Sequence, residues 1–319
     1  MYCSLHLAAH PDAPTASGQP AAHRTEHAAN PARRGNVEWP TWLLIAAIYG
    51  GWLGSVLAWR QLGPWLGTPL LVVFTCWYLS LQHELIHGHP SRHAWLNALL
   101  GWAPLAVWYP YPVYRDSHLA HHHDDHLTLP GIDPESYYQR AAGQPGAWLA
   151  LLRWRNTAPG RLLLGPALGW GATLLAAWRQ RDVRTSCIWS AHVLLLSGML
   201  LLLARAGIAP LYYLLAVAYP ALSLAMVRSF YEHRAAPQAN ARSVINEAAW
   251  PWRLLFLNLN YHLVHHLHPG IPWFRLRQTY LARREHYRQH CDGFTEQGYL
   301  PLLWRHRRQP VIAEFHPFA

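Results

Sequence analysis

Long apolar stretches alternate with polar, histidine-bearing segments along this chain. Four of the apolar stretches approach the about 20 residues that a helix needs to cross a bilayer. They cover about residues 41–59, 65–82, 186–204 and 210–227. Because a helix satisfies its own backbone hydrogen bonds in lipid, we predict an all-α integral membrane protein with four transmembrane helices.

Two further apolar runs are less suited to crossing. Residues 95–112 contain Asn97 and three prolines, which interrupt a helix and predict an interfacial or re-entrant segment. Residues 161–178 have arginines beyond both ends, which predicts a helix lying along the interface. Residues 1–37 are rich in Ala, Pro and His and are expected to form a disordered cytoplasmic tail, with 38–319 as one membrane domain.

The arginines support four crossings. With four, both termini and all histidine-rich segments share one side, and the connections on the other side carry only Arg60 and Arg205. The positive-inside rule then assigns the histidine-rich side to the cytoplasm. The net charge of +10 comes from arginines that flank apolar runs, without a lysine, so it indicates a membrane protein rather than a nucleic-acid-binding one. The four cysteines are scattered and indicate neither a disulfide framework nor a thiolate metal site.

The histidines of residues 115–126, RDSHLAHHHDDH, carry the main chemical signal. His118, His121 and His122 fall at i, i+3 and i+4, so a helix places them on one face. Neutral imidazoles grouped in this way are typical of a transition-metal site. The spacing recurs later in the chain and, in a shorter form, earlier: His262, His265 and His266, and the pair His83 and His87. Eight histidines exceed the four to six ligands of one metal and suit two.

Carboxylates near these histidines are candidates to support them. A ligating histidine usually donates its second N–H to a carboxylate or carbonyl. Five acidic residues could serve, or could be ordinary loop polarity: Asp116, Asp124, Asp125, Asp133 and Glu135. Four histidines beside the boxes are expected to be supporting or solvated: His89, His123, His126 and His268. His192 lies within an apolar span, where we expect a helix–helix hydrogen bond.

The first pair also permits a different chemistry. Residues 83–87 match HExxH, in which two histidines bind zinc and the glutamate, here Glu84, is the general base of a metalloprotease. That interpretation needs only one further zinc ligand and does not account for the two HxxHH segments. A metal transporter or sensor is a third possibility, but it would place metal-binding residues within the spans, where only His192 lies. A two-metal enzyme accounts for all three segments.

These segments resemble the three histidine boxes of the membrane fatty-acid desaturase and hydroxylase superfamily. HELIH, HLAHH and HLVHH occur in the family's order, and HHLHPGIPW and DPES are similar to sequences beside its boxes. The resemblance covers about residues 65–277. It implies two non-haem iron ions, O2 as co-substrate, and a separate electron donor of ferredoxin, rubredoxin or cytochrome b5 type with its reductase. The implied reaction is oxidation of an unactivated C–H bond in a lipid chain in the inner membrane, by desaturation or alternatively by hydroxylation or ketolation.

The resemblance also implies a ninth ligand and a division of ligands between the irons. The family uses a histidine between the last span and the third box, and His233 is at the matching position. Four residues earlier, stearoyl-type members carry an asparagine that holds a water, whereas this chain has Ser229. By this analogy one iron takes His83, His122, His233 and His265, and the other takes His87, His118, His121, His262 and His266.

Overall fold

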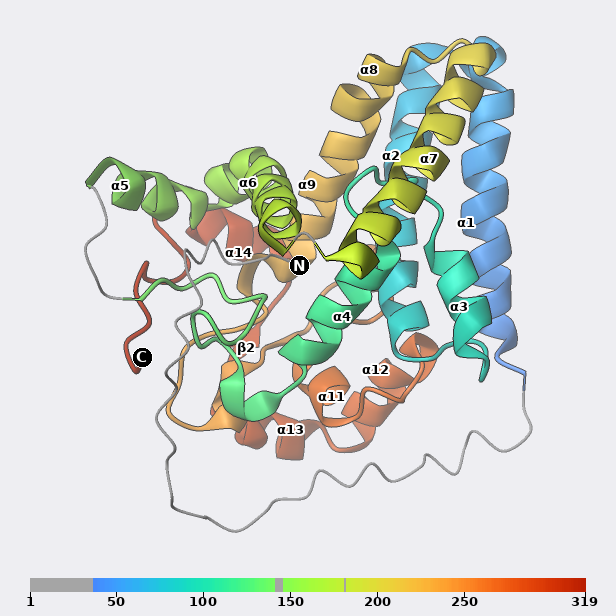
Figure 1. Ribbon diagram of the computed structural model, residues 1–319. Helices are drawn as coiled ribbons and strands as arrows, with labels where there is room; N and C mark the ends of the chain where they lie inside the picture. Colours follow the sequence, from blue (N-terminus) through green and yellow to red (C-terminus); the bar gives the residue numbers. More distant parts are fainter. Residues whose placement is uncertain (1–36, 141–145, 181) are drawn as a thin grey trace.

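The computed structural model describes residues 37–140, 146–180 and 182–319 (Figure 1). The expected N-terminal tail therefore lies, except for its last residue, outside the described residues. Within them the fold is mostly helical, with one pair of two-residue strands. The longer helices are α1 (Trp39–Leu57), α2 (Trp59–Ile86), α3 (Ala94–Gly101), α4 (Tyr111–His121), α5 (Gly146–Arg155), α6 (Ala158–Gln180), α7 (Val183–Ala206), α9 (Tyr219–Arg228), α12 (Trp273–Ala282), α13 (Arg284–His290) and α14 (Tyr299–Arg305). The shorter elements are α8 (Pro210–Tyr212), α10 (Trp250–Leu255), α11 (His262–Leu267) and the parallel strands β1 (Ile245–Asn246) and β2 (Thr295–Glu296).

Four helical segments are long and apolar enough to cross a membrane, as predicted. They are α1, α2, α7 and a composite fourth span, Pro210–Tyr231, that contains α8 and α9. Figure 1 shows them side by side in one bundle. Helix α6 is not among these candidates in the described ranges, and its axis runs across the bundle (Figure 1). The count of four spans is confirmed, and an interfacial position for α6 stays a prediction.

Local sequence explains the breaks within these spans. Gly63 has φ 62° and ψ 177°, which is not helical, and Pro64 begins the long regular part of α2 because proline is well placed in a first turn. In the fourth span, the backbone from Tyr213 to Ala218 widens into a π-helix just before Pro220. Proline lacks the N–H that an α-helix would use, so the wider turn accommodates it.

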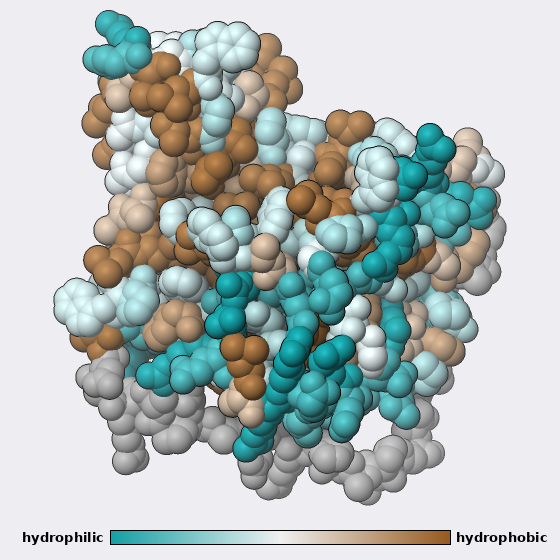
Figure 2. Space-filling model, turned by 180° about the vertical axis from the view of Figure 1, so that it is seen from behind, coloured by the Kyte–Doolittle hydropathy of each residue, from teal (hydrophilic) through white to brown (hydrophobic). Residues whose placement is uncertain are grey.

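A polar cap covers one end of the bundle. It contains α4 and the segments α10 to α14, and all three histidine boxes lie in it or at its border with the spans. Seen from behind, brown apolar side chains dominate the column of spans, and teal hydrophilic ones gather around the lower part (Figure 2). The start of α1 also lies at this end, since the Glu38 carboxylate accepts a hydrogen bond from His89 Nδ1 at 2.8 Å.

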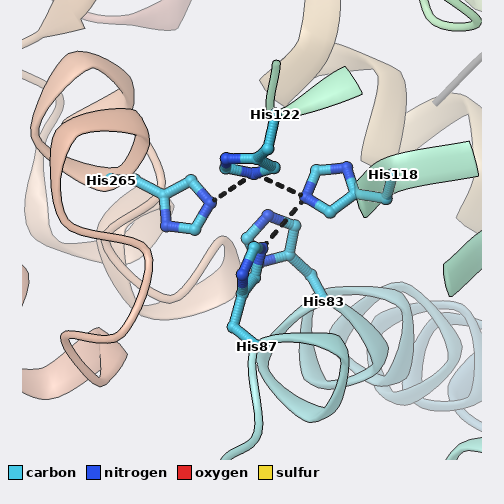
Figure 3. Close-up of side chains that lie close together, drawn as sticks. All are labelled: His83, His87, His118, His122 and His265. Carbon is cyan, nitrogen blue, oxygen red and sulfur yellow. Dashed lines mark hydrogen bonds between the residues drawn. The ribbon is translucent and has the colours of Figure 1, made fainter. Parts of the chain in front are cut away.

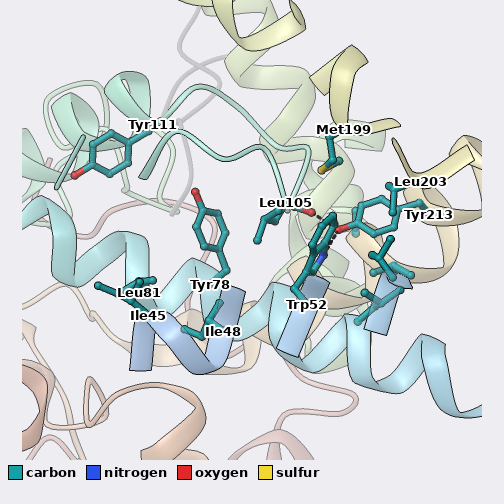
Figure 4. Close-up of a cluster of buried hydrophobic side chains, with 14 of the residues drawn as sticks. Ile45, Ile48, Trp52, Tyr78, Leu81, Leu105, Tyr111, Met199, Leu203 and Tyr213 are labelled. Carbon is teal, nitrogen blue, oxygen red and sulfur yellow. Dashed lines mark hydrogen bonds between the residues drawn. The ribbon is translucent and has the colours of Figure 1, made fainter. Parts of the chain in front are cut away.

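The segment predicted as a helix over residues 95–112 is helical only at its start. Helix α3 ends at Gly101, and residues 102–110 form an irregular loop that enters the bundle (Figure 4). The Leu105 carbonyl at its tip accepts a hydrogen bond from Tyr213 at 2.6 Å, and Tyr213 in turn accepts one from Trp52 Nε1 at 2.9 Å. Trp52 lies thirteen residues, or about 20 Å, along α1 from the cap. The loop is consistent with a re-entrant segment, which stays a prediction, and Pro104 and Pro110 lie in the non-helical part that follows α3.

Side chains of all four spans satisfy the backbone carbonyls of this region. Tyr78 and Gln82 of α2 donate to the Gly101 carbonyl at 2.6 and 2.8 Å. His192 Nε2 of α7 lies 3.3 Å from the Val107 carbonyl. The other donors come from the first and fourth spans: Tyr49 to Leu100 and Tyr213 to Leu105. An irregular backbone at membrane depth requires such partners, because an unsatisfied carbonyl in lipid costs several kcal/mol.

His192 thus supports the loop and not a neighbouring helix. The expected helix–helix hydrogen bond is wrong in its partner, because the space beside α7 is filled by a loop whose carbonyls have no intrahelical donors. The same loop leads directly to Tyr111, the first residue of α4. Its position therefore helps to set the position of the second histidine box.

Removing one donor should destabilise the bundle. Tyr213→Phe loses the hydrogen bonds to Leu105 and from Trp52 while it keeps the ring, so we expect a loss of about 1–2 kcal/mol and a lower unfolding temperature in detergent. Tyr212→Phe is the matched control, because that hydroxyl bonds Thr68 in an exposed setting. Equal unfolding temperatures for the two variants would contradict the assigned role of Tyr213.

Candidate metal centre

Three helices and one loop position the predicted histidine ligands. His83 and His87 lie at the end of α2, where the span meets the cap. His118 and His121 occupy the last turn of α4, and His122 follows as its C-cap. The remaining four come from α11 and from the segment after the fourth span: His262, His265, His266 and His233. Residues almost 200 positions apart in the chain therefore converge.

The structure brings all nine histidines into two sets. One set has five members, His83, His87, His118, His122 and His265 (Figure 3). The other has four, His121, His233, His262 and His266. In each set the possible ligand atoms lie within 4.8 Å of one another. The expected partition is wrong: His87 and His118 join the set of His83, and His233 joins that of His121. Histidines four residues apart on one helix share a face and stay in one set, as His83 and His87 do.

The spacing of the imidazole nitrogens matches the edges of a metal coordination shell. His118 Nε2 lies 3.1 Å from both His87 Nε2 and His122 Nε2. In the other set, His233 Nε2 lies 3.0 Å from His121 Nε2 and 2.9 Å from His262 Nε2. Two nitrogens bound to one metal at right angles would be about 3.0 Å apart, against about 3.4 Å at a tetrahedral angle. The spacing therefore favours a shell of more than four ligands.

Carboxylates fix the tautomers of two of these rings. His121 Nδ1 lies 2.8 Å from Asp133, and His118 Nδ1 lies 3.1 Å from Glu135. A carboxylate accepts a hydrogen bond, so each Nδ1 carries the proton and each Nε2 presents its lone pair to the histidine set. Asp133 is itself held by the backbone N–H groups of Thr128 and Glu135, at 2.8 Å each. This arrangement is the one that metal-ligating histidines use.

The other expected supporting residues lie in different places. Asp116 is on the surface of α4 and pairs with Arg115 and Arg184 at 2.8 Å each, so the structure does not bring it to the histidines. Ser229 is buried and lines a cavity together with His233. Three of the adjacent histidines are exposed: His123, His126 and His268.

Two supporting residues were missed in the sequence. The Glu232 carboxylate lies 3.5 Å from His262 Nδ1 and also accepts a 2.6 Å hydrogen bond from Arg228. Ser243 Oγ lies 3.3 Å from His233 Nδ1. A signal for Glu232 was present, because it directly precedes His233 and follows Arg228 by one helical turn. Ser243 had none, since only the fold places it beside His233.

Burial keeps most of the rings neutral. Desolvation, followed by repulsion from neighbouring imidazoles, holds the pKa values of His122, His233 and His265 well below their ordinary range. Burial also lowers the pKa of His118, to about 4, against the pull of Glu135. His121 differs: burial acts to lower its pKa, but Asp133 and Glu135 outweigh it and raise the value. Neutral imidazoles are the form that binds a metal.

His83 gives an independent indication of bound metal. Its side chain is fully buried, and neither ring nitrogen has a hydrogen-bond partner among the described residues. A buried polar group without a partner costs about 1–3 kcal/mol. The rings of His118 and His265 lie 4.5 Å from it, centroid to centroid, and offer further nitrogens rather than donors to satisfy it. A metal ion in the five-histidine set would supply the missing partner, so the residues fit two metals.

The glutamate of the HExxH sequence is engaged elsewhere. Glu84 is buried, and its carboxylate accepts a hydrogen bond from the backbone N–H of Trp273 at 3.0 Å. This contact ties α2 to the start of α12, just beyond the third box. The two histidines of the sequence belong to a set of five, which exceeds the three protein ligands of a catalytic zinc site with an open position.

Comparison with known proteins agrees with this geometry. The model of the fatty acid desaturase family matches residues 62–298, which include all nine histidines. The chain is also similar to the sn-1 oleoyl-lipid 12-desaturase of Arthrospira platensis, with 24% identity over 263 residues that cover 75% of this chain and 73% of the relative.

Loss of the Asp133 carboxylate should weaken metal binding. In Asp133→Asn the amide can present its N–H₂ to His121 Nδ1, so residue 133 no longer fixes the tautomer of His121. We therefore expect the metal affinity of the four-histidine set to fall about 10–100-fold. Metal content after dialysis against a graded series of chelator concentrations measures this. Asp116→Asn is the matched control and should behave as wild type. Retention of both metals by Asp133→Asn at wild-type chelator concentrations would refute the role of Asp133.

Proposed function

Because the chain belongs to the fatty acid desaturase family, we propose that it oxidises an unactivated C–H bond in a lipid chain, with two iron ions and O2. The observation that carries the proposal is the convergence of nine histidines into two adjoining sets at coordination distance. When bound, the two irons supply the chemistry that activates O2 for this reaction. Imidazole ligands also suit zinc, copper and nickel, so the choice of iron is supported by the family.

The protein's own residues orient the ligands and exclude water. The five-histidine set would hold one iron and the four-histidine set the other. Asp133 and Glu135 would keep His121 and His118 in the ligating tautomer. The Glu232 carboxylate lies near His262 Nδ1, at 3.5 Å. Eight of the nine rings belong to the boxes that α2, α4 and α11 pack together, so the pair of metals would be rigidly held.

Two small cavities lie on the membrane side of the histidines, where a lipid chain would reach the metals. One lies beside α2, α4 and the re-entrant loop, and is lined by Leu79, Trp108 and Tyr114 among others. The second is lined by Leu79, Trp108 and the Leu222–Ser229 part of the fourth span. The cavities adjoin, since they share Leu79 and Trp108. Leu79 precedes His83 by one helical turn, which would place a bound chain directly beside the metals.

Desaturation is the favoured outcome. The relative from Arthrospira platensis is named an oleoyl-lipid desaturase, and this chain matches the fatty acid desaturase family over residues 62–298. Hydroxylation or ketolation would need only a different placement of the chain in the two cavities.

The reaction also requires an electron donor that can reach the polar cap. Two electrons per turnover would come from a separate donor of ferredoxin, rubredoxin or cytochrome b5 type with its reductase. The polar cap would face the cytoplasm from the inner membrane, since the opposite connections carry only Arg60 and Arg205. The donor would then meet the cap on the side where the metals lie.

Metal content tests the proposal directly. Protein purified in detergent should contain about two irons per chain, and His121→Ala should contain less, because it removes one ligand of the four-histidine set. With a ferredoxin, its reductase and NADPH added, wild-type protein should convert at least one plain or hydroxylated acyl lipid to an oxidised product, and only when O2 is present. About one zinc per chain, unchanged in His121→Ala, would overturn the di-iron assignment.

Glu84→Gln separates this enzyme from a zinc protease. The amide oxygen can still accept the hydrogen bond from Trp273, so metal content and lipid oxidation should stay within about twofold of wild type. A metalloprotease would lose its general base and all of its activity. Peptidase activity of wild-type protein that disappears in Glu84→Gln would favour the protease instead.

A further inference from the structure

A tyrosine whose hydroxyl has no partner among the described residues lines the first of the two cavities. Tyr114 is 2% exposed and lines this cavity, and its hydroxyl has no hydrogen-bond partner among the described residues. Tyr78, which lines the same cavity, and Tyr213 of the same core both donate to carbonyls of the re-entrant region. The Tyr114 hydroxyl is thus unlike them, and burying it without a partner is unfavourable.

Tyr114 lies next to the reacting region. It precedes His118 by one turn of α4, and the two ring centroids are 5.7 Å apart. Leu79, which lines the same cavity, precedes His83 by one turn of α2. Tyr114 therefore lies one helical turn from the five-histidine set, where a chain in the cavity would present the carbon to be oxidised.

The ring of Tyr114 does not itself require a hydroxyl. It packs within the apolar core and meets the Tyr109 ring edge-on at 6.0 Å. Phenylalanine would make the same ring contacts without burying an unsatisfied donor. A bound ligand that accepts a hydrogen bond from the Tyr114 hydroxyl would satisfy this donor, which the packing of the ring does not.

We propose that Tyr114 is a specificity residue that donates a hydrogen bond to an oxygen atom on the substrate chain, close to the carbon that is oxidised. The substrate class is then an oxygen-bearing lipid chain, such as a hydroxylated acyl chain, rather than a plain hydrocarbon chain. This inference rests on the proposed function for the location of the reacting carbon. A site that hydrogen-bonds a substrate oxygen discriminates strongly, because the analogue without the oxygen leaves the buried donor unpaired.

Ligand binding tests this without turnover. Thermal unfolding of the full-length, metal-loaded protein in detergent is measured during titration with stearate and with a series of hydroxystearates that differ in hydroxyl position. We expect at least one isomer to bind wild-type protein about tenfold more tightly than stearate does. In Tyr114→Phe this advantage should disappear, while stearate binds as well as before or better.

Two controls separate specificity from structure. Tyr114→Phe should unfold at the wild-type temperature or above, since it removes only an unpartnered oxygen. Tyr109→Phe changes a second ring of the same cavity and should keep the preference for the hydroxylated chain. The proposal is overturned if no isomer binds wild-type protein better than stearate, or if the advantage persists in Tyr114→Phe.

The two proposals fail in different ways. If the chain is not an O2-dependent lipid oxidase, no product forms from any lipid, but the binding preference and its loss in Tyr114→Phe are still observed. If only the specificity assignment is wrong, oxidised products form and the hydroxyl brings no advantage in binding.

Discussion

The structure depends on directing the lone pairs of nine imidazole rings toward two points, the centres of the two histidine sets. Nitrogens about 3 Å apart, such as those of His118, His87 and His122, repel one another when neither carries a proton between them. Asp133 and Glu135 place the protons on the far side of His121 and His118, so these rings have only lone pairs to offer. A cation at each point turns this repulsion into attraction. The rest of the fold holds three helices firmly enough that the sets persist.

The scaffold that holds them uses polar contacts where lipid would favour apolar ones. The loop of residues 102–110 enters the bundle and joins α3 to α4, so it connects the membrane part to the second histidine box. Tyr213 and His192 satisfy carbonyls of this loop, and Gln82 satisfies that of Gly101 just before it, so three different spans contribute. The cavities of the candidate substrate site lie against this loop, at Trp108 and Val107. One irregular segment therefore shapes both the ligand geometry and the space for the chain.

Much of this could be predicted from sequence because it is encoded locally. The spacing of His118, His121 and His122 is a property of one helix, and the length of each apolar run is a property of one span. The division of ligands between the two sets is not local: His233 joins His121 across 112 positions of the chain. The support of Leu105 by Tyr213 spans 108 positions, so the proline pattern could suggest a re-entrant segment but not its partners. Helices and loops that are predicted from local sequence can still pack against one another in several ways, and only the tertiary contacts determine which packing forms.

The dependence of the loop on the fourth span has a consequence for biogenesis. When α1 to α4 have been synthesised, the Leu105 carbonyl has no Tyr213 to meet, and the Val107 carbonyl has no His192. Left in lipid alone, this backbone would be costly to bury, so the loop reaches its final depth only after α7 and the fourth span have been inserted. The second histidine box follows that loop directly, and the third is made later still. A metal centre that uses all nine histidines would therefore be complete only after all four spans had been made.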